Sequence, residues 1–138
     1  MTIKQLSVFL GNKTGRINDV VRTLGKNGIN MHAFSMAETA DFGILRLIVS
    51  DVDKAVEVLR EQDFAVMSTD VVCLDCENVP GSLAVVLEYL AAEQIFIDYM
   101  YAFAQNDRAH VVIKPNDMTR CLEVLERHQC DVLTKDKL

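Results

Sequence analysis

The sequence lacks any run of about 18 consecutive apolar residues and any signal-peptide pattern, since its first residues lead directly into a strand-like alternation. It also has little positive charge: 14 Lys and Arg residues are outnumbered by 20 Asp and Glu residues, giving a formal net charge of -6. An acidic protein repels phosphate backbones and anionic membrane surfaces on average. We therefore expect a cytoplasmic protein with neither nucleic acid nor membrane as a partner.

Recognisable catalytic sequences are also missing. The chain contains no G-x-S-x-G, no Walker sequence, no G-x-G-x-x-G and no H-E-x-x-H, and its 6 glycines are too dispersed to cradle phosphates. We expect a protein that is not an enzyme, with no catalytic residue and no cofactor. The alternative is a small enzyme that uses Arg16 together with Asn12.

Cysteines are few, and the composition argues against a disulfide framework. Half of the residues are hydrophobic, so the chain can build a core without the cross-links that small secreted domains need. The thiols at 73, 76, 121 and 130 are predicted to be reduced and structural. Cys73 and Cys76 form a C-x-x-C pair, but residues three apart in a strand point to opposite faces, so we expect no metal site. Metal binding through this pair is the alternative.

An internal repeat organises the chain. A shift of 66 residues superimposes the two halves without an insertion or deletion. The matching positions are Asn12 and Asn78, Gly15 and Gly81, Val20 and Val86, Leu24 and Leu90, Ile29 and Ile95, Asp41 and Asp107, and Val66 and Val132. The sequence therefore predicts two equivalent domains, residues 1–70 and 71–138.

Each copy reads as βαββαβ. Alternation predicts strands, and spacings of three and four predict helices with one apolar stripe, while Asp51 is a candidate N-cap. In the first copy the strands are 3–10, 29–37, 42–49 and 64–72, with helices around 17–24 and 52–59. In the second copy the strands are 71–76, those starting at 95 and 109, and 131–135, with helices around 83–90 and 116–128.

These elements predict an α+β protein of two ferredoxin-like domains side by side. Residues 71–76 end one copy and begin the next, which leaves no room for a linker. We expect one continuous eight-stranded antiparallel sheet with four helices on one face. Apolar residues on an uncovered face, such as Phe34, Met36 and Met100, make a homodimer a further expectation.

The chemically suggestive feature of each copy is the turn between its first strand and first helix. The first N–H groups of a helix lack intrahelical acceptors and lie at the positive end of the dipole, so they can receive a carboxylate where glycine permits close approach. Asn12 and Asn78 could bind an amino acid or simply cap the helix. The residues alone leave both roles open.

The motifs resemble those of ACT domains. They are Asn12-Lys13-Thr14-Gly15-Arg16-Ile17, then Gly28-Ile29-Asn30-Met31, Phe42-Gly43-Ile44-Leu45-Arg46-Leu47 and Asn78-Val79-Pro80-Gly81-Ser82-Leu83. The whole chain is similar to stand-alone proteins made of two tandem ACT domains. This resemblance implies a regulatory protein that binds a free amino acid or a similar small ligand and acts on a separate, unidentified enzyme.

The resemblance also implies a site. ACT domains pair through their second strands, and ligands bind between one domain's first turn and its partner's second strand. The implied ligand-binding residues are Asn12, Lys13, Thr14, Gly15, Arg16, Ile17, Asn30, Met31, His32, Asn78, Val79, Pro80, Gly81, Ser82, Leu83, Ile97, Asp98 and Tyr99. The second copy departs from the family at Gln94-Ile95-Phe96, where Gly-x-Asn is expected, so its strand is expected to hold a ligand differently or not at all.

Overall fold

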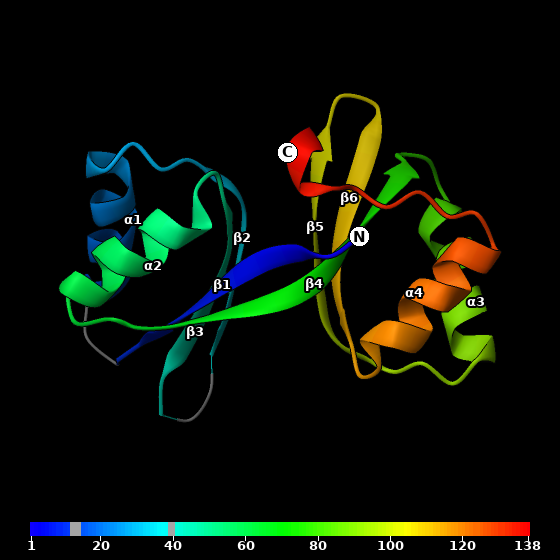
Figure 1. Ribbon diagram of the computed structural model, residues 1–138, viewed down its shortest axis with the longest axis horizontal. Helices are drawn as coiled ribbons and strands as arrows, with labels where there is room; N and C mark the ends of the chain where they lie inside the picture. The colour runs from blue at the N-terminus through cyan, green and yellow to red at the C-terminus, as the bar shows by residue number, and fades with distance from the viewer. Residues whose placement is uncertain (12–14, 39–40) are drawn as a thin grey trace. The chain divides into compact units, whose positions relative to one another are not determined.

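The computed structural model describes residues 1–11, 15–38 and 41–138, and its strands and helices alternate as the repeat predicts (Figure 1). The strands are β1 (Ile3–Leu10), β2 (Met31–Glu38), β3 (Gly43–Val49), β4 (Ala65–Glu77), β5 (Ile97–Gln105) and β6 (Arg108–Pro115). The helices are α1 (Arg16–Lys26), α2 (Val52–Glu61), α3 (Ser82–Ala92), α4 (Met118–Arg127) and a 3-10 turn, η1 (Lys135–Lys137). Among the described residues, every helix is too short or too polar to cross a membrane.

The unit Lys4–Thr69 packs α1 and α2 on one face of antiparallel strands (Figure 1). β1 pairs with β3 and β3 pairs with β2, so that Val8 lies beside Leu45 and Leu47 beside Phe34. Because side chains alternate along a strand, the apolar residues of one face meet the apolar stripes of both helices. The resulting core contains Leu6, Val8, Leu10, Val20, Leu24, Leu45, Leu47, Ala55, Leu59 and Phe64.

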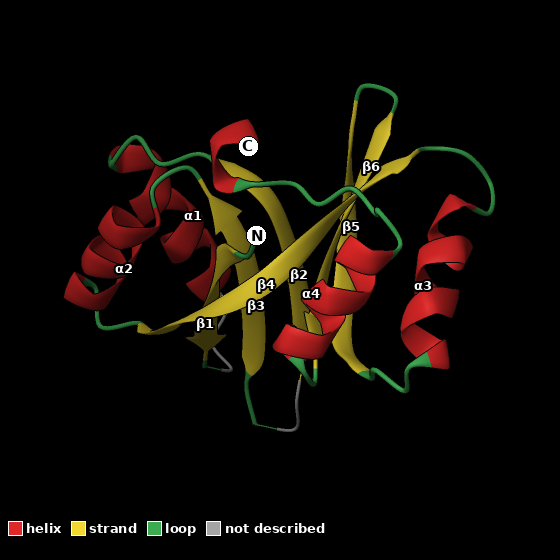
Figure 2. Ribbon diagram, turned by 45° about the vertical axis from the view of Figure 1, so that its right-hand side comes forward, coloured by secondary structure: helices red, strands yellow, loops and turns green. Residues whose placement is uncertain are grey.

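The other unit, Asp70–Leu138 with Met1–Ile3, repeats this arrangement. β4 pairs with β6 and β6 with β5, and α3 and α4 supply the helical side of the core (Figure 2). This core contains Val72, Leu74, Cys76, Leu90, Ile95, Val111, Ile113, Cys121, Val124 and Leu125.

The repeat extends to individual hydrogen bonds. After α1 the N–H of Ile29 donates to the carbonyl oxygen of Leu24 at 3.0 Å, and after α3 the N–H of Ile95 donates to Leu90 at 3.0 Å. Asp51 caps α2 by accepting from the N–H of Lys54 at 3.1 Å, and Asp117 caps α4 in the same way with Arg120. The N-cap role expected of Asp51 is thus confirmed.

Backbone conformations repeat as well. Gly15 and Gly81 precede the first helix of each copy with φ of 89° and 87°, a left-handed conformation that glycine adopts without a Cβ clash. At the end of that helix Gly28 has φ of 68°, whereas the matching Gln94 has φ of 58° despite its side chain. The fold therefore imposes the same turn on both copies, even where the second copy carries no glycine.

The expectation of eight strands is wrong. The structure forms a six-stranded sheet in the order β2-β3-β1-β4-β6-β5. Two expected strands merge into β4, whose 13 residues serve both copies, and the expected final strand is reduced to a bridge between Val132 and Leu74 followed by η1. In this order β2 and β5 stand at the two ends, so the second strands are not paired with one another within the sheet.

Candidate functional site

The turn before α3 is shaped by backbone hydrogen bonds. The N–H of Asn78 donates to Asp107 at 3.0 Å, that of Ser82 donates to Val79 at 3.3 Å, and the Ser82 hydroxyl donates to the carbonyl oxygen of Glu77 at 2.6 Å. No side chain caps α3, and the side chain of Asn78 is exposed. The first turn of the helix therefore presents backbone donors that an anionic group could use.

The matching turn before α1 contains Asn12, Lys13 and Thr14, which lie outside the described residues. Gly15 is the N-cap residue of α1 and, like Gly81, provides no side-chain cap. An added Cβ at either glycine would have no heavy atom of the described residues within 4 Å, its immediate chain neighbours left aside. Close approach to the backbone is therefore open at both glycines.

A pocket of about 240 Å³ lies beside the start of α3. It is formed by the end of β4, the start of β6, the first turns of α3 and the chain after α4. Its lining residues are Asp75, Cys76, Glu77, Ser82, Val86, Arg108, Gln129, Cys130 and Asp131. Ser82 belongs to the expected turn, whereas Asp75 and Arg108 were not among the sequence-predicted site residues.

Arg108 is the only cationic residue among the described residues that line this pocket. Its Nε donates to the Asp75 carboxylate and its Nη2 to the Asp75 carbonyl oxygen, each at 2.9 Å, and it lies 3.8 Å from the exposed Asp131. Hydrogen bonding to Asp75 raises the pKa of Arg108 further, so the guanidinium stays charged. One cation beside several carboxylates, next to free helix N–H groups, can bind both ends of a zwitterion.

The same position in the first copy is filled by aromatic rings. Phe9 and Phe42 occupy the positions of Asp75 and Arg108, and their ring centroids lie 5.7 Å apart in an edge-to-face arrangement. The guanidinium of Arg16 lies 4.1 Å above the ring centroid of Phe64. Comparing the two copies in sequence would have revealed Asp75 and Arg108, because a polar pair replaces an aromatic pair.

The second-strand residues of the expected site have other contacts. The N–H of Asn30 donates to the Ser50 hydroxyl at 2.9 Å, while Asp98 lies 3.6 Å from the Lys114 ammonium. His32 and Tyr99 are half-buried on β2 and β5. Asp98 is therefore already paired, which reduces its availability to a ligand's amino group.

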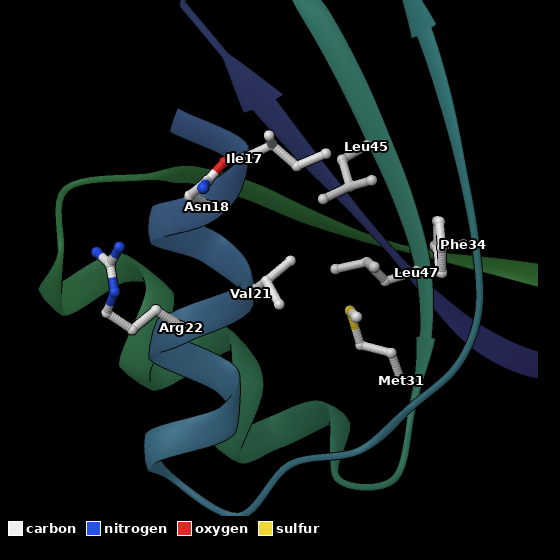
Figure 3. Close-up of a pocket in the computed structure, with 8 residues that line it drawn as sticks. All are labelled: Ile17, Asn18, Val21, Arg22, Met31, Phe34, Leu45 and Leu47. Carbon is white, nitrogen blue, oxygen red and sulfur yellow. The ribbon is translucent and has the colours of Figure 1, made fainter. Parts of the chain in front are cut away.

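Ile17 and Met31, two more of the expected residues, line an apolar groove of about 570 Å³ between α1 and the strands β2 and β3 (Figure 3). Val21, Leu45 and Leu47 point into the same space, and Phe34 lies at its edge with 62% of its surface exposed. In the second copy, the matching Leu83 and Ile97 pack against the core of their own unit, as Ile17 and Met31 also do in theirs. The residues expected to bind a ligand therefore lie in three different places: the turns before the helices, the strands β2 and β5, and the apolar groove.

The cysteines have the properties of structural thiols. All four are free, and burial raises the pKa of Cys73 to about 12 and that of Cys121 to about 11. Burial also raises the pKa of Cys76 and Cys130. A raised thiol pKa disfavours the thiolate that metal binding and nucleophilic attack require. No group of three or more His, Cys, Asp or Glu suited to a metal occurs among the described residues.

A family profile described as an ACT domain pair matches residues 1–138, and the chain belongs to this family. The resemblance inferred from the motifs is thereby confirmed. The chain is 53% identical to protein BT0572 from Bacteroides thetaiotaomicron, with a TM-score of 0.94 and coverage of 99% of this chain and 95% of that one.

Two aspartate kinase regulatory subunits share the fold at 14% identity. The Thermus thermophilus protein, in its ligand-free form, has a TM-score of 0.63 and coverage of 90% of this chain and 91% of that one. The Thermus flavus protein has a TM-score of 0.60, with coverage of 90% of both chains. No curated protein matches the chain.

Proposed function

We propose that this protein is a non-catalytic regulator that binds a free amino acid at its strand-to-helix turns. The observation that carries the proposal is the pocket beside α3, where Arg108, acidic side chains and an uncapped helix N-terminus meet. In this proposal the ligand's carboxylate accepts hydrogen bonds from the first N–H groups of α3, from the Asn78 amide and from Arg108, and its ammonium group lies near Asp131 and Glu77. Membership of the ACT domain pair family and the fold shared with regulatory subunits of aspartate kinase support this function.

The proposal extends to the assembly. β2 and β5 are the end strands of the sheet and carry exposed apolar residues, Phe34 and Met36 on β2 and Met100 on β5. We propose that these strands pair with those of a second copy, whose second strand closes the ligand site. Multi-angle light scattering should then give the mass of a dimer. Phe34→Asp should shift the mass to that of the monomer, because it places a charge in an apolar interface.

A thermal-shift screen of the twenty amino acids identifies the ligand, because binding to the native state raises Tm by mass action. Calorimetry then tests the site. Arg108→Gln and Asn78→Ala should each weaken binding roughly ten- to a hundredfold, the range expected for a lost charge-assisted hydrogen bond. Asn78→Ala should leave stability unchanged, since Asn78 does not cap α3.

The double variant Asp75→Phe, Arg108→Phe converts this pocket to the aromatic filling of the first copy and should abolish binding while the protein still folds. Arg120→Gln is the matched control: Arg120 lies seven residues before the end of α4, about 10 Å along its axis, and does not line the pocket, so binding should be unchanged. Unchanged affinity in the double variant, or turnover of any ligand by the purified protein, would contradict the proposal.

A further inference from the structure

A second concave surface lies within the unit Lys4–Thr69, between the outer side of α1 and the chain that follows α2. This basic groove has a volume of about 330 Å³, and its lining includes Arg16, Asp19, Arg22, Lys26, Gln62 and Phe64. We propose that it binds a small molecule carrying two or more negative charges, of the phosphorylated or polycarboxylate class. The proposal concerns a site separate from the amino-acid pocket beside α3.

The charges of the basic groove do not cancel. Of the described residues that line it, Asp19 alone is acidic, and its carboxylate is shared by two guanidinium groups, Arg22 at 3.0 Å and Arg16 at 3.8 Å. Lys26 makes no ion pair with any described residue. Three cations and one anion leave a net charge of about +2 in a protein whose net charge is -6. This local excess attracts anions.

The cations of the basic groove are spread along α1. Arg16 is held in place by the Phe64 ring, so its guanidinium loses little conformational freedom on binding. Lys26 follows ten residues later on the same helix, which is about 15 Å along its axis. A volume of about 330 Å³ lies near the lower end of the range of small-molecule pockets, roughly 300 to 1,000 Å³. A small anion with two or three charged groups can therefore enter the groove and contact Arg22 together with a cation at one end.

Arg22 stands between these two ends. Arg22 also lines the apolar groove on the other side of α1, but Figure 3 shows its guanidinium pointing away from Val21 and Leu47. Its hydrogen bond to Asp19 leaves further N–H donors of the guanidinium for an anion.

The second copy closes the same space. Thr23 and Gln62 correspond to Tyr89 and His128, whose rings stack with centroids 3.8 Å apart and planes within 4°. The charge is also reversed there, because Arg22 corresponds to Glu88. Since the backbones repeat, the open and basic character of the groove comes from the side chains of the first copy.

Calorimetric titration with pyrophosphate and with citrate tests this site. At least one of the two should bind the wild-type protein saturably, more weakly at high salt, and the stronger one indicates whether phosphate or carboxylate groups are preferred. Arg22→Glu with Lys26→Ala, which introduces the residues of the second copy, should weaken binding roughly tenfold or more. Lys26→Ala alone, which breaks no described side-chain contact, should weaken it several-fold.

The matched control is Arg120→Glu, which makes the same charge change as Arg22→Glu on α4 of the other unit. It should bind the anion as the wild type does, and circular dichroism should show that all variants fold. Absence of saturable binding of either anion, or equal loss of binding in Arg120→Glu, overturns the proposal. The best amino-acid ligand should bind the Arg22→Glu, Lys26→Ala variant normally, so failure of this proposal is distinguishable from failure of the amino-acid site.

Discussion

The two copies share their helix caps and left-handed turns but carry different side chains, and the contrast is sharpest beside the first helix of each copy. At α1 the end of the sheet is filled by Phe9 and Phe42, while at α3 the equivalent positions hold the ion pair of Asp75 and Arg108. Aromatic rings fill space without a requirement for hydrogen bonds. An ion pair leaves a polar pocket, and this is where we place amino-acid binding.

In a second region, it is the first copy that has the open space and the second copy that has it filled. Between the helices, the second copy is filled by the stacked rings of Tyr89 and His128, whereas the first copy has an open groove with Arg16, Arg22 and Lys26. Each copy has thus kept open the space that the other has filled. The comparison teaches that the caps, the left-handed turns and the apolar stripes maintain the fold, while other positions are free to diverge in function.

The largest expected effect concerns residues that both copies share. Leu24→Ala and Leu90→Ala remove equivalent side chains that are each 1% exposed, and each should lower the free energy of unfolding by about 2 to 5 kcal/mol. Urea denaturation should show one transition for both variants, because β4 belongs to both units. A difference of more than about 2 kcal/mol between the variants would show that the two cores are not equivalent.

Removal of either helix cap should lower the free energy of unfolding by a smaller amount, and by the same amount in both copies. Asp51→Ala and Asp117→Ala each remove a carboxylate that accepts from a helix N–H at 3.1 Å, and each should cost about 1 kcal/mol. Asn at either position should retain most of the stability. Asp53→Ala, in the first turn of α2 but not a cap, is the control and should cost only a few tenths of a kcal/mol. Thermal unfolding would measure the stability of all these variants. A loss of stability in only one of the two cap variants would show that the caps of the two copies are not equivalent.

Substitutions at the two matching left-handed positions, Gly28 and Gln94, should change the free energy of unfolding in opposite directions. Gln94→Gly should stabilise the protein by about 0.5 kcal/mol, because glycine removes the strain of a φ of 58° but adds freedom to the unfolded chain. Gly28→Gln should destabilise by a similar amount, since no atom lies within 4 Å of the added Cβ and only backbone strain changes. Chemical denaturation of both variants tests this, and destabilisation by Gln94→Gly would mean that the Gln94 side chain makes its own contribution.

The smallest effect depends on pH and belongs to the second copy alone. Arg127 donates to Glu93 at 2.7 Å and thereby lowers the pKa of that carboxyl below its ordinary 4.5, whereas the matching residue of the first copy is the uncharged Asn27. The contribution to stability is therefore fully present above pH 4.5 and is lost as the pH falls through the lowered value. The melting temperatures of wild type and Glu93→Gln should differ above pH 4.5 and approach one another as the pH falls below it. A difference in melting temperature that stays constant with pH would contradict this.

Much of the fold could be predicted from the sequence, because its signals are local. The spacing of Val20 and Leu24 predicts the buried stripe of α1, and Asp51 predicts the start of α2. The final strand could not be predicted as well, because residues 131–135 have a strand-like pattern but only Val132 finds a bridging partner. Of the residues that line the pocket beside α3, Ser82 was among those expected to bind a ligand, and that role stays a prediction. Arg108 could not be expected there, because it lies 33 residues from Asp75 and reaches it only through the pairing of β4 with β6.

The sequence by itself determined the repeat, the order of helices and strands, the apolar faces and the glycine turns, because each depends on residue types at short, regular spacing. Only the tertiary structure decided that two expected strands would merge into β4, that β2 and β5 would end the strand order, and which polar residues would share a pocket. These features depend on strand register and on side-chain volume across neighbouring strands. Such long-range geometry is not encoded by any single local pattern.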